Sequence, residues 1–283
     1  MATLARRPLV GELVAEFLGT LVLILFGTAV VAQVVTSKGD LGDHDSIAWA
    51  WGLGVVFGVY TAARISGAHL NPAVTVALAA FRDFEWRKVL PYSVAQVAGA
   101  FVAALIVRAG YAEAIATIDP KHTVATQGIF STLPGNGAMD VSHGSALLDQ
   151  IIGTAILLFL ILAVTDTRNS APVAWMAPFI VGLIVVAIGM AWGTNAGYAI
   201  NPARDLGPRL ASFITGYQTA FEDQNGALYF WVPIVGPIVG GLLGAAAYVH
   251  LVERFLPLAE EETEVGEVPT EAPNPHSEAQ SVR

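Results

Sequence analysis

The fold of this protein is decided by residues 197–209, which read GYAINPARDLGPR. Asn201 is predicted to cap the start of a helix with its side-chain oxygen, and Pro202 suits the first helical position, where no N–H group is needed. The apolar residues 176–192 before it approach the length of a membrane span, whereas the segment after Arg209 is too short for another. The sequence therefore predicts a short helix that begins inside a bilayer.

Nearly the same signal occurs earlier, in residues 67–75, which read GAHLNPAVT. Asn71 and Asn201 are 130 positions apart (201 − 71), and each copy follows a hydrophobic stretch. Each copy also has a glycine and a ring-bearing residue, His69 or Tyr198, just before its asparagine. A single Asn-Pro is common at turns and helix starts. Two copies at matching places indicate an internal repeat that carries the function.

The composition is that of a membrane protein. Of the 283 residues, 54% are hydrophobic and 13% are charged, with a mean hydropathy of +0.60, which is too apolar for a soluble domain. The apolar run 9–35 is too long for a secretory signal, so we expect it to remain as the first span. The absence of cysteine excludes disulfides and thiolate sites. No metal-ligand spacing, phosphate-binding loop or catalytic set occurs, so we expect no metal, cofactor, catalytic residue or nucleic-acid partner.

Hydropathy predicts six membrane spans and two half-length helices. The spans cover residues 9–35, 46–64, 89–110, 145–166, 173–192 and 229–252, and the half-length helices cover about 71–80 and 201–213. An even number of spans places both termini on one side, and the basic residues choose that side. On one side lie Arg6, Arg7, Arg82, Arg87, Lys88, Arg168 and Arg254, and on the other lie Lys38, Arg108 and Lys121. The sequence therefore predicts a multi-pass protein of the cell membrane with cytoplasmic termini.

The end of the chain differs in composition from the rest. Residues 257–283 are rich in Pro and Glu and contain almost nothing apolar, which is typical of disorder. We expect residues 1–256 to form the membrane domain and residues 257–283 to form an acidic, disordered cytoplasmic tail.

The two halves of the membrane domain, about 8–110 and 145–256, repeat further signals. Residues 16–20 read EFLGT and match residues 150–154, which read QIIGT. Because each half contains three spans, the second half must enter the membrane from the opposite face. The half-length helices then meet near the midplane with their N-termini facing, which predicts a pore. Small residues predict close packing between spans at Gly52, Gly54, Gly58, Gly182, Gly236, Gly240 and Gly244.

The two Asn-Pro-Ala copies resemble the twin signature of the major intrinsic proteins, the aquaporin family, over roughly residues 8–256. Asp205 after the second copy resembles the glycerol-facilitator branch, as do Arg209 four residues later and Pro233-Ile234 in the last span. The resemblance implies an all-α, aquaporin-like membrane fold with six transmembrane helices and two re-entrant half-helices in an inverted repeat. It also implies a homotetramer with one pore per subunit.

The residues before each half-length helix are expected to line the pore, because irregular backbone at membrane depth survives where it borders a wet cavity. Their carbonyls accept hydrogen bonds from water and polyols, while the asparagine NH₂ groups act as donors. The two helix N-termini and the charge of Arg204 oppose cations and protons. The predicted pore-lining carbonyls are those of Gly67, Ala68, His69, Gly197 and Ala199, and the predicted pore motifs are Asn71-Pro72-Ala73 and Asn201-Pro202-Ala203.

By the family pattern, the narrowest ring of the pore takes Trp51, Gly189, Tyr198 and Arg204. The two aromatic faces accept the CH edge of a polyol, Arg204 binds its hydroxyls, and Gly189 leaves room. Water-selective relatives narrow this ring with a histidine. Alternatively, the aromatic residues are interfacial anchors, Gly189 only allows close packing, and Arg204 is a buried structural ion. Their places in the motif frame favour the ring.

Several residues are predicted to hold the loops in place. Glu16 is expected to accept buried N–H bonds from a half-helix loop, and Gln150 takes the matching place, where the family usually has a glutamate. This departure weakens the expected symmetry, although an amide still accepts a hydrogen bond. His69 is expected to tie down backbone carbonyls rather than bind a metal. Asp205 is expected to form an ion pair with Arg209, one helical turn later. Residues 129–136 resemble an extracellular loop that covers the pore mouth.

The favoured interpretation is a passive channel in the lipid bilayer for glycerol and related small uncharged solutes, which also passes water. The main alternative is a water-selective channel of the same fold, against which Trp51, Gly189 and Asp205 argue. An ion-coupled transporter needs a titratable cluster in the membrane, and the spans offer little beyond Glu16. A membrane enzyme is disfavoured because no nucleophile, base and orienting group occur together.

Overall fold

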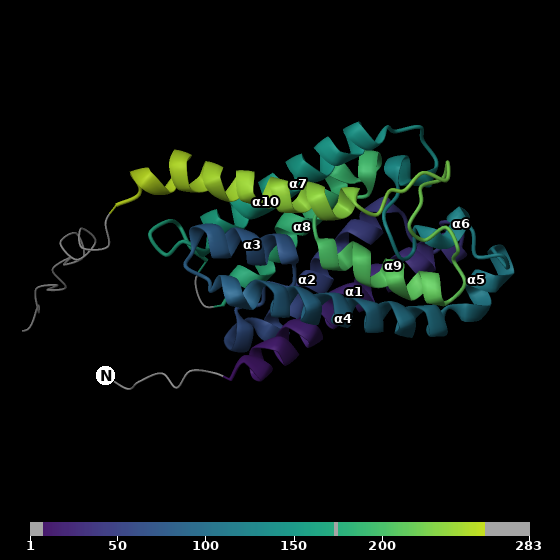
Figure 1. The fold of residues 1–283 in the computed structure, drawn as a ribbon, viewed down its shortest axis with the longest axis horizontal. Coiled ribbons are helices and arrows are strands. Elements are labelled where there is room, and N and C mark those ends of the chain that lie inside the picture. The colour runs from purple at the N-terminus through teal and green to yellow at the C-terminus, as the bar shows by residue number, and fades with distance from the viewer. Residues whose placement is uncertain (1–7, 173–174, 258–283) are drawn as a thin grey trace, which may run out of the picture.

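Six long helices dominate the computed structural model, which describes residues 8–172 and 175–257 (Figure 1). Each is long and apolar enough to cross a membrane, as the hydropathy predicts. The fifth and sixth begin a few residues later than expected, and all but the first residue of the predicted tail lies outside the described residues. The six are α1 (Leu9–Thr36), α2 (His44–Ser66), α4 (Trp86–Gly110), α7 (His143–Thr165), α8 (Ala177–Ala196) and α10 (Val232–Leu251).

Two half-length helices, α3 (Pro72–Phe81) and α9 (Pro202–Ile214), complete the repeat. The Asn71 side-chain oxygen accepts the Ala73 N–H at 2.8 Å, and the Asn201 oxygen accepts the N–H groups of Ala203 and Arg204 at 3.0 and 3.2 Å. Both asparagines therefore cap helices that begin with proline, as predicted. The predicted half-length helices are confirmed within one residue at each end.

The two halves interlock around the half-length helices. In each half the first long helix packs against the second and third, α1 on α2 and α4 and α7 on α8 and α10. Each half-length helix packs most on the third long helix of the other half, α3 on α10 and α9 on α4. Figure 1 shows α3 toward the end of the molecule where the described chain begins and ends, and α9 toward the opposite end. The inverted arrangement predicted from the repeat is thus confirmed.

Glycines let the long helices approach closely. A Cβ added to Gly52 of α2 would lie 2.7 Å from the carbonyl oxygen of Gly182 in α8, and the reverse addition meets the Gly52 carbonyl at the same distance. On α10, Gly240 and Gly244 face the carbonyls of Ile151 and Ala155 with no room for a side chain. The close packing predicted from the small-residue spacing is therefore present between and within the halves.

The long connection between α4 and α7 has structure that the sequence did not predict. It contains α5 (Ala112–Ile118), α6 (Val124–Gln127) and the 3₁₀ turn η1 (Pro134–Gly137), and a further turn, η2 (Glu253–Phe255), follows α10. Residues 129–135 are buried although they belong to a loop. This loop is held inside the molecule by contacts with α9 that are described below.

Candidate transmembrane pore

Two cavities meet at three side chains in the middle of the molecule. The inner cavity, about 460 Å³, extends from this meeting point to Thr165 at the end of α7 and Trp175 before α8. The outer cavity, about 320 Å³, lies on the other side and is bounded by the start of α2 and residues 124–136. Trp51, Tyr198 and Arg204 line both cavities. We call these three side chains the ring.

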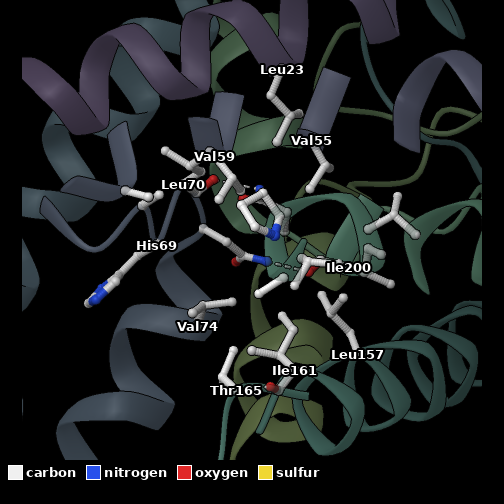
Figure 2. A pocket seen from close by; sticks show the side chains of 18 of the residues that line it. Leu23, Val55, Val59, His69, Leu70, Val74, Leu157, Ile161, Thr165 and Ile200 are labelled. Carbon is white, nitrogen blue, oxygen red and sulfur yellow. Dashed lines mark hydrogen bonds between the residues drawn. The ribbon is translucent and has the colours of Figure 1, made fainter. Parts of the chain in front are cut away.

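The inner cavity is mostly apolar. Figure 2 shows side chains such as Leu23, Val55 and Leu157 around it, from α1, α2 and α7. Its polar lining comes from the backbone before the half-length helices and from Asn71 and Asn201. Most of the cavity wall that a solute contacts is therefore apolar, and the polar groups form a line along one part of that wall.

The ring packs an arginine on an aromatic face. The guanidinium carbon of Arg204 lies 4.1 Å from the centre of the Trp51 ring, a cation–π geometry. The Trp51 ring in turn rests on Gly27 of α1, where no side chain would fit. Trp51, Tyr198 and Arg204 are 3%, 6% and 7% exposed. The ring is thus buried among the helices although both cavities reach it.

Gly189 supports the ring from behind. A Cβ added to Gly189 would lie 3.0 Å from the Cε2 and Cζ atoms of Tyr198 and 3.1 Å from the Cβ of Ala48. Three of the four predicted ring residues line both cavities, whereas Gly189 lines neither. The room that Gly189 leaves is therefore occupied by the edge of the Tyr198 side chain.

The polar atoms of the ring are free of protein partners within the described residues. The Tyr198 hydroxyl is buried and has no hydrogen-bond partner there. The backbone N–H of Arg204 bonds to Asn201, but its guanidinium forms no hydrogen bond or ion pair with another described side chain, its contact being the Trp51 face. The Arg204 guanidinium can bind a solute that passes between the cavities, whereas the Tyr198 hydroxyl is enclosed on the side of the ring toward Gly189.

The loop before each half-length helix has the same unusual backbone. The φ angle is positive at Ala68 and Leu70 in the first loop and at Tyr198 and Ile200 in the second, and the preceding glycines are also left-handed. Such conformations cost free energy for residues other than glycine and cluster at functional sites. Within the described chain, no protein group donates a hydrogen bond to the carbonyls of Gly67, Ala68, His69, Gly197 and Ala199.

The two loops are tied to each other crosswise. The Asn71 amide donates to the Ile200 carbonyl at 2.9 Å, and the Asn201 amide donates to the Leu70 carbonyl at 2.8 Å. Each amide NH₂ has two hydrogens, so one remains for the cavity. The N-termini of α3 and α9 therefore face each other at the inner cavity, as predicted.

Glu16 and Gln150 hold equivalent atoms of the two loops. Glu16 is fully buried and accepts the N–H groups of His69 and Leu70 at 2.9 and 2.7 Å. Gln150 accepts the Ile200 N–H at 2.9 Å and donates to the Ala196 carbonyl at 2.8 Å. The amide thus keeps one of the acceptor bonds and adds a donor bond that a carboxylate cannot form. Near these contacts, Gly19 faces the Leu70 side chain and Gly153 faces Ile200.

Asp205 and Arg209 anchor the loop over the outer cavity. They form the predicted ion pair at 2.6 Å and are fully buried. Asp205 also accepts the Thr132 N–H and hydroxyl at 2.8 and 2.7 Å, and Arg209 donates to the carbonyls of Thr132 and Ala220. These bonds explain why residues 129–135 are buried. The other two predicted branch markers, Pro233 and Ile234, lie in the first turn of α10 and line neither cavity.

His69 has a different partner from the one predicted. Its Nδ1 lies 3.2 Å from the Thr75 hydroxyl, and its ring packs on Phe84 and Tyr92 with centroids 4.6 and 5.2 Å apart. Figure 2 shows the imidazole pointing away from the inner cavity. Only the backbone of His69 faces the cavity. The left-handed residues on either side, Ala68 and Leu70, turn its side chain away from the cavity and toward Thr75, Phe84 and Tyr92.

A charged cluster lies at the inner mouth. Arg168, in the loop after α7, donates to Asp166 at 2.9 Å and to Glu253 at 2.5 Å, and Arg82 donates to the other Glu253 oxygen at 2.7 Å. Hydrogen bonds from the Arg168 guanidinium hold the pKa of Asp166 below its ordinary value. The cluster joins the α7–α8 loop to the ends of α3 and α10.

Sequence reasoning missed His44 in the outer cavity and, although it placed Asn136 in the predicted loop 129–136, missed what Asn136 binds. Asn136 donates to the Gly193 and Thr194 carbonyls at 3.0 and 3.3 Å and so holds the end of α8. His44 lies 2.8 Å from the Gly189 carbonyl. One signal was available for His44: it precedes Trp51 by seven residues, two helical turns, and so shares its face of α2.

Comparisons with known proteins agree with this geometry. A family model described as "Major intrinsic protein" matches residues 3–248. The chain is 43% identical over 263 residues to Aquaporin-10 of Milnesium tardigradum, a match that covers 87% of this chain and 64% of that protein, so the chain spans just under two thirds of its length. It is 42% identical over 269 residues to the Glycerol uptake facilitator protein of Pseudomonas aeruginosa, covering 92% of this chain and 95% of that protein. The solved aquaglyceroporin from Plasmodium falciparum matches with a TM-score of 0.78 at 35% identity, covering 87% of this chain and 97% of that one.

Proposed function

The chain belongs to the major intrinsic protein family, and we propose that it is a passive transmembrane channel for glycerol and related small uncharged solutes, which also passes water and excludes protons and ions. It is a channel rather than an enzyme. The observation that carries the proposal is the meeting of two cavities at a buried ring of Trp51, Tyr198 and Arg204, backed by Gly189. The water-selective alternative is disfavoured because no histidine narrows this ring.

In the proposed mechanism, a polyol crosses the ring with its carbon chain against the aromatic faces and its hydroxyls on the polar side. Arg204 binds the hydroxyls, because its guanidinium is not committed to a protein hydrogen-bond partner in the described chain. Beyond the ring, the free carbonyls accept hydrogen bonds, and the remaining amide hydrogens of Asn71 and Asn201 donate them. A solute therefore exchanges its hydration shell for protein contacts one group at a time.

Ion exclusion follows from the charges along the same path. The N-termini of α3 and α9 meet at the inner cavity, and each carries about half a positive charge. Arg204 adds a full charge at the ring with no described acidic group bonded to it. A cation loses hydration and is repelled by Arg204 and by the two helix N-termini, whereas a neutral polyol loses little. A water molecule held by two asparagine donors cannot easily relay a proton.

The proposed assembly is a homotetramer with one pore per subunit, in the cell membrane, with both termini cytoplasmic. The outward faces of the long helices expose large apolar side chains, such as Leu53 and Phe57 on α2 and Val239 and Leu243 on α10, which suit lipid or a neighbouring subunit. Arg82 and Arg168 lie at the inner mouth of the pore. Basic residues are enriched on the cytoplasmic side of membrane proteins, which supports a cytoplasmic position for the inner mouth.

The test is stopped-flow light scattering on proteoliposomes that contain the purified protein. We expect glycerol and water permeability well above that of empty liposomes, and no proton or sodium conductance under a membrane potential. High water permeability without glycerol permeability would favour the water-selective alternative. A glycerol-coupled proton current would contradict a passive channel.

A further inference from the structure

His44 lies at a fixed position beside the ring. It is the first residue of α2, and the helix start is fixed by a capping box in which Asp43 accepts the Ser46 N–H at 2.9 Å. The Nε2 atom of His44 lies 2.8 Å from the Gly189 carbonyl oxygen in α8. A carbonyl oxygen accepts only, so the imidazole donates this bond.

The contact belongs to a continuous stripe on one face of α2. His44, Ala48 and Trp51 follow one another at helical spacing, and all three meet the site: Trp51 is in the ring, and Ala48 leaves 3.1 Å to a Cβ added at Gly189. The His44 imidazole also presents its edge to Tyr198, with centroids 6.3 Å apart and planes at 87°. The stripe therefore places the His44 donor and the Ala48 methyl group against Gly189, and it places Trp51 in the ring itself.

The segment of α8 that receives this bond is irregular. Trp192 departs from helical geometry, with φ −122° and ψ 19°, and the imidazole rests directly on Gly193, where no side chain would fit. Asn136 holds this segment beyond the distortion, at the Gly193 and Thr194 carbonyls. The hydrogen bond from His44 holds it one turn before the distortion, at the Gly189 carbonyl. Because the edge of the Tyr198 ring fills the space where a Gly189 side chain would lie, a shift of this segment changes the support of Tyr198.

We propose that His44 is a positioning residue of the channel: its hydrogen bond to Gly189 fixes the backing of Tyr198 and so sets the width of the ring and the selectivity between solutes. This inference rests on the proposed function and concerns a residue outside the ring. His44 lines the outer cavity, but its effect on selectivity acts through Gly189 and Tyr198.

The test uses three substitutions that separate the two contacts. His44→Gln keeps a donor of similar reach without the ring, His44→Phe keeps a ring without the donor, and His44→Ala removes both. The measured quantity is the ratio of the permeability of xylitol, a five-carbon polyol, to that of glycerol in proteoliposomes. We expect this ratio to rise about fivefold in His44→Ala and His44→Phe, because loss of the bond frees Tyr198 to withdraw, and to stay near the wild-type value in His44→Gln.

A matched control is available at the start of α7. His143 is also the first residue of its helix after a capping residue, Ser142, and its Nε2 lies 2.7 Å from Asp223, but it lines neither cavity. His143→Gln should leave the ratio unchanged. A selectivity ratio does not respond to a general loss of folded protein, which lowers all fluxes together.

Three outcomes would overturn the inference about His44. Unchanged ratios in all three variants, or a shift in His44→Gln with none in His44→Phe, would show that the hydrogen bond does not set the ring. A solved structure of His44→Ala with Gly189 and Tyr198 in unchanged positions would do the same whatever solute the channel conducts. Absence of glycerol flux in the wild-type protein would instead contradict the proposed function, and the solved structure would still decide the role of His44.

Discussion

Tyr198 brings into the ring a buried hydroxyl that has no partner within the described chain. Leaving such a group unsatisfied costs the folded protein about 1–3 kcal/mol. The hydroxyl is enclosed on the side of the ring toward Gly189, so it gains a hydrogen bond when the Tyr198 ring moves to admit a solute with hydroxyl groups. The same atom that weakens the resting fold is therefore suited to select a polyol.

The substitution Tyr198→Phe tests this interpretation, because it removes one oxygen and keeps the ring. We expect glycerol permeability to fall about two- to fivefold relative to 1,2-propanediol, which has one hydroxyl fewer to bind. Thermal stability should stay the same or rise, since no protein hydrogen bond is lost. Parallel measurements of solute flux and melting temperature check both expectations. Equal losses for the two solutes would mean that the hydroxyl does not contact the permeating molecule.

Gly189 offers a second test at the same scale. Because a Cβ there would already lie 3.0 Å from Tyr198, Gly189→His must push the Tyr198 ring or enter the pore itself. We expect glycerol permeability to fall more than water permeability, since the imidazole fills volume but still bonds to water. Gly189→Ala, which adds only the Cβ, should shift the ratio in the same direction by less. If both variants lower the two permeabilities in proportion, Gly189 serves packing alone.

The braces of the two half-helix loops differ in chemistry although they hold equivalent atoms. Glu16 accepts hydrogen bonds from Leu70, His69, Ser66 and Gln96, which suits a side chain with two acceptor oxygens. Gln150 accepts from one loop N–H and donates to one carbonyl. Each side chain therefore matches the donors and acceptors around it. Gln150 makes a donor bond that glutamate at this position could not make.

This match predicts that exchanging the two side chains destabilises the protein. In Gln150→Glu an acceptor oxygen faces the Ala196 carbonyl, and in Glu16→Gln an NH₂ group faces a donor. Each single variant should lose about 1–3 kcal/mol of stability, and the double exchange should not restore it. Thermal unfolding in detergent provides the measurement. Wild-type stability in either single variant would show that the brace tolerates a mismatched hydrogen bond.

At the scale of the whole molecule, the pattern of spans was predictable and the ring backing was not. Hydropathy located the six long helices, and Asn-Pro located α3 and α9, because these signals depend on local sequence. The depth of residues 129–135 depends on Asp205, 73 positions from Thr132, and α5 and α6 are too short for a periodic signal. The place of Gly189 behind Tyr198 depends on how α8 packs against the loop before α9, a tertiary contact for which the local sequence gives no cue.

The proposed orientation is testable because the chain has no cysteine. Lys121, in the connection between α5 and α6, and Arg254, after α10, are both exposed on opposite ends of the molecule. A membrane-impermeant maleimide added to intact cells should label Lys121→Cys and leave Arg254→Cys unlabelled until the cells are opened. The reverse pattern would place the termini outside.

The crosswise bonds between the two loops have a kinetic consequence. Each asparagine amide is fastened to the loop of the other half, Asn71 to Ile200 and Asn201 to Leu70, and each half-length helix packs on the opposite half. A carrier that works by rocking one half against the other must break such hydrogen bonds in every cycle. In this protein the bonds instead hold the two halves together while solutes pass. Labelled glycerol should therefore enter at a rate that unlabelled glycerol on the far side does not accelerate, and net flux should grow in proportion to the gradient without saturating as a cycling carrier does.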